Sequence, residues 1–278
     1  MIKDVHHVGI AVNNLDDALK FYAETLCLPV VKRGEMRARG VEAAMLAAGH
    51  SYLEVIQPVE DSSPFAKHIA DHGEGLHHLA LWSTDVDADV ATLSAASVPL
   101  QDREPREGFT GRLSYLAPEA FGGAQIELVQ PEPALSGSTA TSETAITRID
   151  HVVLRVPSVN ETSRDLDAWL GVPTKRTMER GEQAFAFMRP GDVVIEVIGP
   201  KGGGEPGSGR IAGLAFEVTG IDDLIERVRA AGYPIGEPHA ALQGGRIVSV
   251  HPTGTCGVPV AFIDFAGSPG PVHRRQAQ

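Results

Sequence analysis

The spacing of hydrophobic residues in the first fifth of the chain changes between that of strands and that of a helix. Val5–Val12 is predicted to be a buried strand, and Asn14 begins a helix whose apolar residues recur at helical spacing. Val41–Leu46 and Tyr52–Ile56 are predicted to be strands joined by a turn at Gly49-His50. One strand, one helix and several further strands together form a βαβββ module.

The same order of elements follows a second time. Gly75–Leu81 is predicted to be the first strand of this module, and Asp85–Ala96 its helix. Leu113–Leu116 and Ala124–Val129 are predicted to be later strands. The polar segment Ser62–Gly73 connects the two modules and is expected to be partly helical.

The organisation then begins again after a linker. Pro131–Ala145 is rich in Pro, Ser, Thr and Ala, which is typical of a linker. The strand Asp150–Val156 echoes His6–Val12, and Val194–Pro200 echoes Tyr52–Pro58. Val228–Ile235 likewise echoes Leu93–Leu100. The offsets of these three matches are 144, 142 and 135 residues, as an internal duplication with shortening loops would leave them. The sequence therefore predicts four modules in two domains.

Composition and charge narrow the class of protein. The 278 residues are 42% hydrophobic, and the net charge of −12 argues against a surface for nucleic acid or an anionic membrane. The two cysteines, Cys27 and Cys256, have no metal-ligand spacing and fit a reducing compartment. No apolar stretch is long enough to span a membrane, and the first strand begins too close to Met1 for a signal peptide. A cytoplasmic protein with a small-molecule partner is expected.

Two histidine pairs stand out within the apolar strands. His77-His78 lies in the run Gly75–Leu81, and His6-His7 opens the first strand. Because successive side chains of a strand point to opposite faces, one histidine of each pair should point inward. A single buried histidine is usually satisfied by a hydrogen bond, but the recurrence of the pair favours a shared function.

Two glutamates recur at matched positions with these histidines. Glu54 and Glu127 each lie in the last strand of a module, flanked by apolar residues, where an unpaired carboxylate would be costly. Taken singly, each glutamate could be an outward-facing strand residue. With His7 and His78 at matched places, the four side chains would satisfy one another through a divalent cation.

These motifs resemble the vicinal oxygen chelate superfamily, which comprises glyoxalases, bleomycin resistance proteins and dioxygenases built from paired βαβββ modules. The first domain, from about Val5 to Pro131, resembles the methylmalonyl-CoA epimerases. The resemblance implies an α+β fold in which the four modules pair into two domains with curved mixed sheets. It implies domains at residues 1–132 and 146–266, a linker at 133–145 and a flexible tail at 267–278. The motifs that carry it are His6–Val12, Leu53–Pro58, Ser63-Pro64-Phe65, Gly75–His78 and Gly122–Leu128.

By the family's pattern the metal ligands are His7, Glu54, His78 and Glu127, which leaves positions for substrate oxygens. Such donors suit Co, Ni, Mn, Fe or Zn. The second domain departs from the pattern, because it retains His151 and Glu196 but has Gly213 and Ala261 at the other two positions. It is predicted to be a structural partner that has lost its chemistry.

The resemblance implies an epimerase or isomerase that removes a proton next to a carbonyl and forms a metal-stabilised enolate. Candidates for the catalytic base are Glu127, Glu54 and Glu42, the last because the epimerases place a catalytic glutamate in this strand. The expected substrate is a 2-substituted 3-oxo acyl compound, with acyl-CoA thioesters among the candidates, and a homodimer is expected. The alternatives, in order, are a glyoxalase-I-like lyase, an extradiol dioxygenase and a non-enzymatic drug-binding protein.

Overall fold

The described part of the chain forms two sheets of eight strands each, and the two have the same strand order. The structure, a computed structural model, describes residues 2–135 and 145–266. The first sheet has the order β2-β3-β4-β1-β5-β8-β7-β6, and the second the order β10-β11-β12-β9-β13-β16-β15-β14. Each half of a sheet is one βαβββ module, so the predicted α+β fold with four modules and curved mixed sheets is confirmed.

The elements of the first sheet follow the predicted modules closely. The residue before α1, Asn14, caps that helix by accepting the Asp17 N–H at 2.9 Å, and the helix then continues as the π-helical segment Lys20–Thr25. Asp85 caps α3 in the same way through the Ala88 N–H at 3.0 Å. The strands are β1 (Ile2–Ala11), β2 (Val30–Met36), β3 (Val41–Ala48), β4 (Ser51–Pro58), β5 (Gly75–Ser83), β6 (Arg106–Glu107), β7 (Gly111–Tyr115) and β8 (Ile126–Pro131), and the helices are α1 (Leu15–Leu19), α2 (Pro64–His72) and α3 (Val86–Ala95).

The second sheet repeats this order from residue 146 onward. Its helices, α4 and α5, occupy the places of α1 and α3 in the first sheet. Its elements are β9 (Ile146–Arg155), α4 (Val159–Leu170), β10 (Thr174–Arg180), β11 (Gln183–Met188), β12 (Val194–Pro200), β13 (Arg210–Val218), α5 (Ile221–Ala230), β14 (His239–Ala240), β15 (Arg246–Val250) and β16 (Val260–Asp264).

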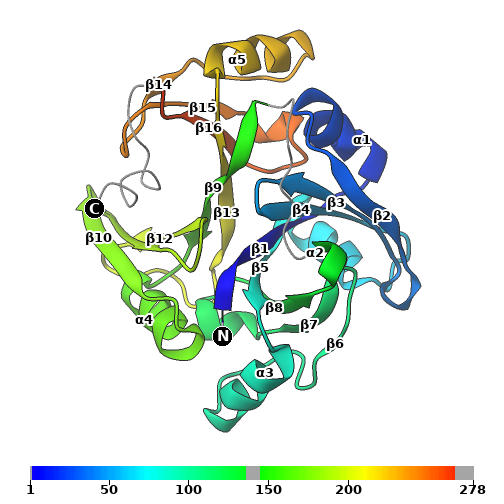
Figure 1. Cartoon of the computed structure of the whole chain (residues 1–278). Helices are drawn as coiled ribbons and strands as arrows, with labels where there is room; N and C mark the ends of the chain where they lie inside the picture. Colours follow the sequence, from blue (N-terminus) through cyan, green and yellow to red (C-terminus); the bar gives the residue numbers. More distant parts are fainter. Residues whose placement is uncertain (1, 136–144, 267–278) are drawn as a thin grey trace. The chain divides into compact units, whose positions relative to one another are not determined.

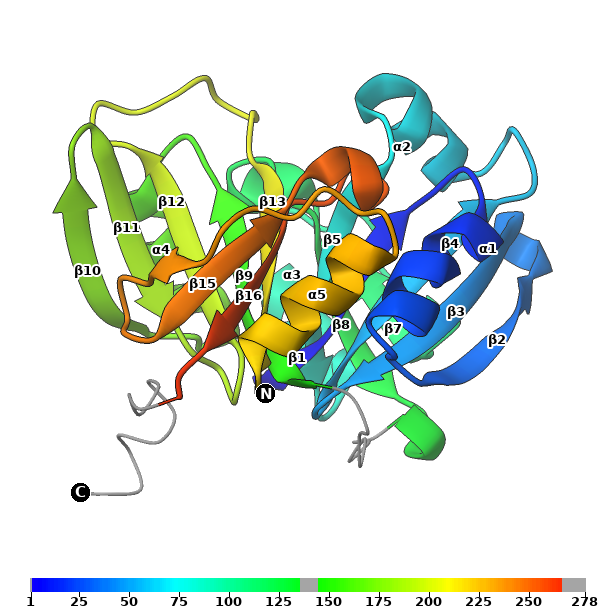
Figure 2. The same ribbon diagram turned by 90° about the horizontal axis from the view of Figure 1, so that it is seen from above.

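Both sheets are mixed in direction. Within the first sheet β5 and β8 run parallel, whereas β2, β3 and β4 form an antiparallel meander. Helix α3 packs against β7 and β8 (Figure 1). Helix α1 packs against β3 and β4, and α4 packs against β10, β11 and β12 (Figure 2). Helices α1, α3 and α4 therefore each pack against strands of their own module.

Contacts between Cα atoms group the chain into two compact units. Unit 1 comprises Met1–Gly9, His77–Gly137 and His151–Ala212, and unit 2 comprises Ile10–Leu76, Ser138–Asp150 and Gly213–Gln278. Each unit thus combines a module from each half of the sequence. The domain boundaries at residues 132 and 146, which follow the sequence repeat, stay a prediction.

The predicted linker and tail lie largely outside the described residues. Of the linker, Pro133–Leu135 forms a 3₁₀ turn and Leu135 is buried, while 136–144 fall outside the described part. The tail 267–278 falls outside it entirely. Among the residues that the structure describes, no helix combines the length and apolar character needed to cross a membrane.

Candidate metal centre

Two fully buried histidines meet in unit 1. His7 comes from β1 and His78 from β5, and their Nε2 atoms lie 3.0 Å apart. Their rings stand at 90° to each other, with centroids 5.1 Å apart. Two imidazole nitrogens that bind one ion at about 2.1 Å, with an N–metal–N angle of about 90°, would be about 3.0 Å apart. The spacing of the two Nε2 atoms therefore fits a shared cation.

Glu127 of β8 faces both of these imidazoles. Its Oε1 lies 3.7 Å from His7 Nε2, and its Oε2 lies 3.6 Å from His78 Nε2. These distances exceed a normal hydrogen bond but are short enough for ligands of one ion. The glutamate is 1% exposed, and β8 places it there by pairing parallel to β5 with Glu127 opposite Ala80.

Glu54 lies in β4, within unit 2, and is buried with 7% of its surface exposed. Unit 1 brings His7, His78 and Glu127 together, and Glu54 as a fourth ligand stays a prediction.

A glycine makes room for one of the candidate ligands. A Cβ atom built on Gly9 would lie 2.1 Å from Cε1 of His78 and 2.2 Å from its Nδ1, both inside van der Waals contact. The His78 ring therefore lies directly against the β1 backbone, which only glycine permits. A glycine inside a strand often marks such a close approach, and this was the available signal in the sequence.

Glu42 lies on the other face of its sheet. In the β3–β4 pairing Glu42 is opposite Gln57, whereas Glu54 is opposite Met45. Since directly opposite residues share a face and faces alternate along a strand, Glu42 and Glu54 point to opposite sides. Glu42 is ion-paired with Arg33 at 2.9 Å and is 29% exposed. This placement does not favour Glu42 as a base.

The second half of the chain has only part of this donor set. His151 Nε2 lies 4.0 Å from an oxygen of Glu196, and both side chains are partly exposed. In the parallel pairing of β13 with β16, Ala261 lies opposite Ala215 in the register that Glu127 and Ala80 have in the first sheet. Ala261 therefore occupies the place of Glu127, as the sequence predicted.

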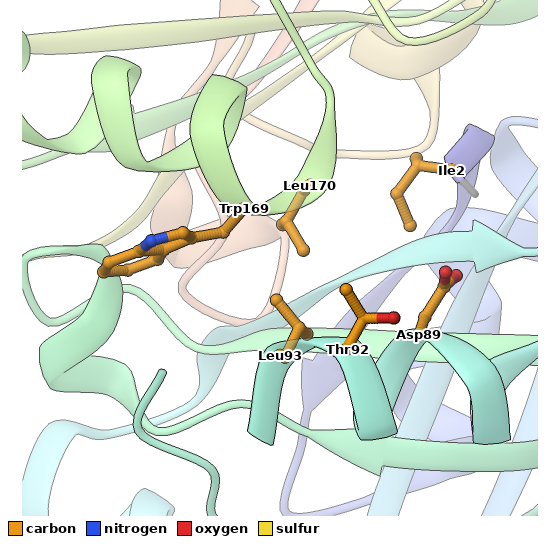
Figure 3. A pocket seen from close by; sticks show the side chains of 6 residues that line it. All are labelled: Ile2, Asp89, Thr92, Leu93, Trp169 and Leu170. Carbon is orange, nitrogen blue, oxygen red and sulfur yellow. The ribbon is translucent and has the colours of Figure 1, made fainter. Parts of the chain in front are cut away.

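A small pocket elsewhere in unit 1 contains no predicted ligand. Figure 3 shows side chains of α3, of α4 and of the start of β1 around it. Its one carboxylate, that of Asp89, accepts a hydrogen bond from Ser83 Oγ at 2.7 Å. The pocket is mainly apolar and offers no cluster of metal donors; its lining residues are Ile2, Asp89, Thr92, Leu93, Trp169 and Leu170.

The donor set fits a divalent transition metal. Imidazole suits Zn, Cu, Fe and Ni, and carboxylate suits harder ions such as Mn, so a mixed set admits several metals. The fit depends on three observations: the Nε2 spacing of the two histidines, the flanking carboxylate of Glu127, and the space that Gly9 leaves for His78. The identity of the metal stays open.

Similar proteins include both enzymes and a protein of unknown function. Protein YqjC of Bacillus subtilis, described as uncharacterized, is 33% identical over 127 residues, which are 45% of this chain and 91% of that protein. Human mitochondrial methylmalonyl-CoA epimerase is 27% identical over 128 residues, which are 45% of this chain and 73% of that protein.

A solved structure matches the fold over the whole chain. A mutant of 4-hydroxymandelate synthase from Streptomyces coelicolor superposes with a TM-score of 0.71, covers 99% of both chains and is 18% identical. At this identity the likeness concerns the fold alone. The sequence profile of the Glyoxalase/Bleomycin resistance protein/Dioxygenase superfamily matches residues 6–116 and 150–249. Because this match extends over more than half of the chain, the protein belongs to that superfamily.

Proposed function

We propose that the protein is a metal-dependent epimerase or isomerase that abstracts a proton next to a carbonyl group. The observation that carries the proposal is the convergence of His7 Nε2 and His78 Nε2, 3.0 Å apart, beside the carboxylate of Glu127. His7, His78 and Glu127 would hold the metal. When bound, the metal supplies a Lewis acid that favours negative charge on a substrate carbonyl oxygen.

The chain's own residues would supply the proton transfer. Two buried glutamates are candidates for the base, since a carboxylate within hydrogen-bond reach of the substrate carbon acid can accept and return a proton. Glu54 is 7% exposed and Glu127 is 1% exposed. Because Glu127 is already proposed as a metal ligand, we assign the base to Glu54. On the β3 strand, the residues that share the face of Glu54 are Val41, Ala43 and Met45, which have no proton acceptor.

The substrate class is proposed from the sequence relatives. Methylmalonyl-CoA epimerases are among them, and the similarity covers 45–46% of this chain. We propose a 2-substituted 3-oxo acyl compound as the substrate, with an acyl-CoA thioester as the first candidate. A homodimer and a cytoplasmic location stay predictions.

Proton exchange tests the proposal directly. The metal-loaded protein is incubated with methylmalonyl-CoA in deuterated water, and deuterium at the acidic carbon is followed by mass spectrometry. Exchange is expected for the wild-type protein and should fall by roughly 100-fold or more in Glu54→Gln, the order of effect expected for loss of a general base. Glu42→Gln is the matched control, because it removes a carboxylate from the opposite face of the same sheet.

The alternatives are distinguished by parallel assays. Turnover of a glutathione hemithioacetal without exchange of methylmalonyl-CoA would replace the epimerase with a glyoxalase-like lyase. Oxygen uptake with a catechol and an iron-loaded protein would instead indicate a dioxygenase. Metal analysis of the purified protein separates all three enzymes from a binding protein, since a protein without stoichiometric metal at this site would contradict every one of them.

A further inference from the structure

The first histidine of the first pair has two defined partners. His6 is fully buried, and its Nε2 lies 3.0 Å from the carbonyl oxygen of Leu135. Its Nδ1 lies 2.7 Å from Nδ1 of His7. The rings of His6 and His7 meet edge to face at 80°, with centroids 5.0 Å apart. His6 thus connects a backbone carbonyl of the 3₁₀ turn Pro133–Leu135 to a proposed metal ligand.

The direction of these hydrogen bonds follows from the chemistry of the groups. A carbonyl oxygen only accepts, so Nε2 of His6 must donate to Leu135. A neutral imidazole has one N–H, so Nδ1 of His6 accepts and Nδ1 of His7 donates. His7 then carries its lone pair on Nε2, the atom that faces His78 and Glu127. A doubly protonated His6 would reverse this order, but a buried charge beside a cation site would be costly.

We propose that His6 is a positioning residue that fixes His7 in the tautomer able to bind a metal through Nε2. The proposal rests on the metal site proposed above and assigns a role to a residue outside the ligand set. The Leu135 carbonyl fixes the direction of the hydrogen bonds from His7 to His6 and from His6 to Leu135. We call this series of hydrogen bonds the relay. The 3₁₀ turn Pro133–Leu135 therefore becomes part of the site.

The second histidine pair extends the relay. Nε2 of His78 lies 3.0 Å from Nε2 of His7, and Nδ1 of His78 lies 2.9 Å from Nδ1 of His77. With the lone pair of His7 on Nε2, the proton between the two Nε2 atoms belongs to His78. Nδ1 of His78 then accepts from Nδ1 of His77. The four histidines donate in one direction, from His77 to His78, from His78 to His7 and from His7 to His6, and His6 donates to the carbonyl of Leu135.

The two ligands are therefore prepared differently. His7 already has the tautomer that a metal requires, whereas His78 must move its proton from Nε2 to Nδ1 before its Nε2 lone pair is available. His77 must then accept at Nδ1 and carry its own proton on Nε2. His77 is half-buried and can exchange this proton with water. Both rings remain neutral, so the number of bound protons does not change.

Long-range proton–nitrogen NMR of the full-length protein with labelled histidines tests this directly. In the metal-free wild type, His7 is expected to be protonated at Nδ1 and His78 at Nε2. After addition of Zn²⁺, His7 should keep its tautomer and His78 should change to Nδ1–H. Signals are assigned by comparison with single His→Gln variants. A His7 protonated at Nε2 in the metal-free protein would overturn the proposal without any variant being needed.

A matched pair of variants tests the role of His6 in affinity. His6→Asn retains an acceptor oxygen near the place of Nδ1, and His6→Leu has nearly the same size without an acceptor. His6→Leu is expected to weaken Co²⁺ binding about 10–100-fold, as loss of such supporting partners does, and to give His7 mixed tautomers. His6→Asn should recover most of that loss. Equal affinities for wild type, His6→Asn and His6→Leu would contradict the positioning role.

These readouts are independent of turnover. If the tautomers and affinities are as expected but methylmalonyl-CoA shows no exchange, the proposed function fails and the role of His6 survives. If exchange occurs but the His7 tautomer is the other one, only the role of His6 fails. If the wild-type protein binds neither Zn²⁺ nor Co²⁺, the metal site and the role of His6 are both contradicted.

Discussion

The two sheets share a strand order but differ at the places where the first sheet gathers metal donors. In the parallel pairing of β5 with β8, Glu127 lies opposite Ala80, and in that of β13 with β16, Ala261 lies opposite Ala215. The backbone register is thus preserved while the carboxylate has become a methyl group. The second sheet forms the same fold with an alanine at this position. Folding therefore does not explain why Glu127 is buried in the first sheet, whereas metal binding would.

A second exchange involves size as well as chemistry. His78 in the first half corresponds to Gly213 in the second, and Gly9, which makes room for the His78 ring, corresponds to the half-buried Val153. In the first half the glycine is Gly9 and the large side chain is His78. In the second half the larger side chain, Val153, stands at the position of Gly9, and a glycine, Gly213, stands at the position of His78. Loss of the ligand and loss of the space for it therefore go together, which indicates that Gly9 serves His78 rather than the strand.

Removing a histidine of the first half should have the largest effect. His7→Ala deletes one of the two imidazoles that meet at 3.0 Å. Metal affinity should fall by more than the loss of about 10–100-fold that is typical of supporting residues. The measurement is metal stoichiometry and a chelator competition titration. His151→Ala, the matched change in the second half, should leave both unchanged. Equal losses for the two variants would mean that the second half also binds metal.

Exchanging the small and large residues tests the comparison more finely. Gly9→Val places a side chain within about 2 Å of the His78 ring, so the ring must move. We expect weaker metal binding and a loss of about 1–3 kcal/mol in the free energy of unfolding, as overpacking causes. Denaturant titration and metal titration measure the two effects.

The reciprocal change supplies the control. Val153→Gly should destabilise the protein by about 1–2 kcal/mol through lost packing and added backbone freedom, without changing metal affinity. If Gly9→Val bound metal as tightly as the wild type, the space at Gly9 would have no role in the site.

Most of the site followed from repetition in the sequence, and the remainder depended on contacts that repetition does not encode. His7, Glu54, His78 and Glu127 were identified because two modules carry the same residue types at matched places. The link from His6 to Leu135 was missed, since it joins residues that lie far apart in the sequence through a backbone carbonyl. Any residue type offers such a carbonyl, so no side-chain pattern marks it.

The face of Glu42 could not be read from the sequence for a different reason. A strand without strict alternation of polar and apolar residues does not fix its own register, and a shift of one residue reverses every side chain. Val41–Ala48 is buried on nearly every position, so the pattern contained no alternation to read. Only the pairing with β4 decided which side chains accompany Glu54.

Glu42→Gln should therefore have a smaller effect than any change at the four donors. The variant breaks the ion pair with Arg33, which also contacts Asp16 at 2.8 Å. Partly exposed ion pairs contribute about 0–1 kcal/mol, so a small loss of stability and unchanged metal affinity are expected. A large loss of proton exchange in this variant, with metal still bound, would return Glu42 to the list of bases and contradict the assignment from the sheet register.

The smallest expected effect concerns Asp4, which lies three residues before His7. The matching residue of the second half is Arg148, three residues before His151. The Asp4 carboxylate accepts the N–H of Asp192 at 3.0 Å, and a Cβ on Gly191 would lie 2.2 Å from its Cγ. Arg148 instead pairs with Glu217. Burial raises the pKa of Asp4 above the ordinary value of an aspartate, against the lowering effect of the backbone donors.

This shift gives the stability of the protein a defined dependence on pH. Because the folded protein holds the Asp4 proton more tightly than the unfolded chain does, the contribution of Asp4 is full below about pH 4 and is lost as the pH rises through the raised pKa. Asp4→Asn lacks this dependence, so its stability relative to the wild type should improve from pH 4 to 7. Asp87→Asn should show the opposite slope below about pH 4, because Arg112 lowers the pKa of Asp87 and this stability is lost only as the pH falls through the lowered pKa. Denaturant midpoints are measured from about pH 2 to 7. A stability difference between Asp4→Asn and the wild type that stays constant from pH 4 to 7 would contradict a raised pKa of Asp4.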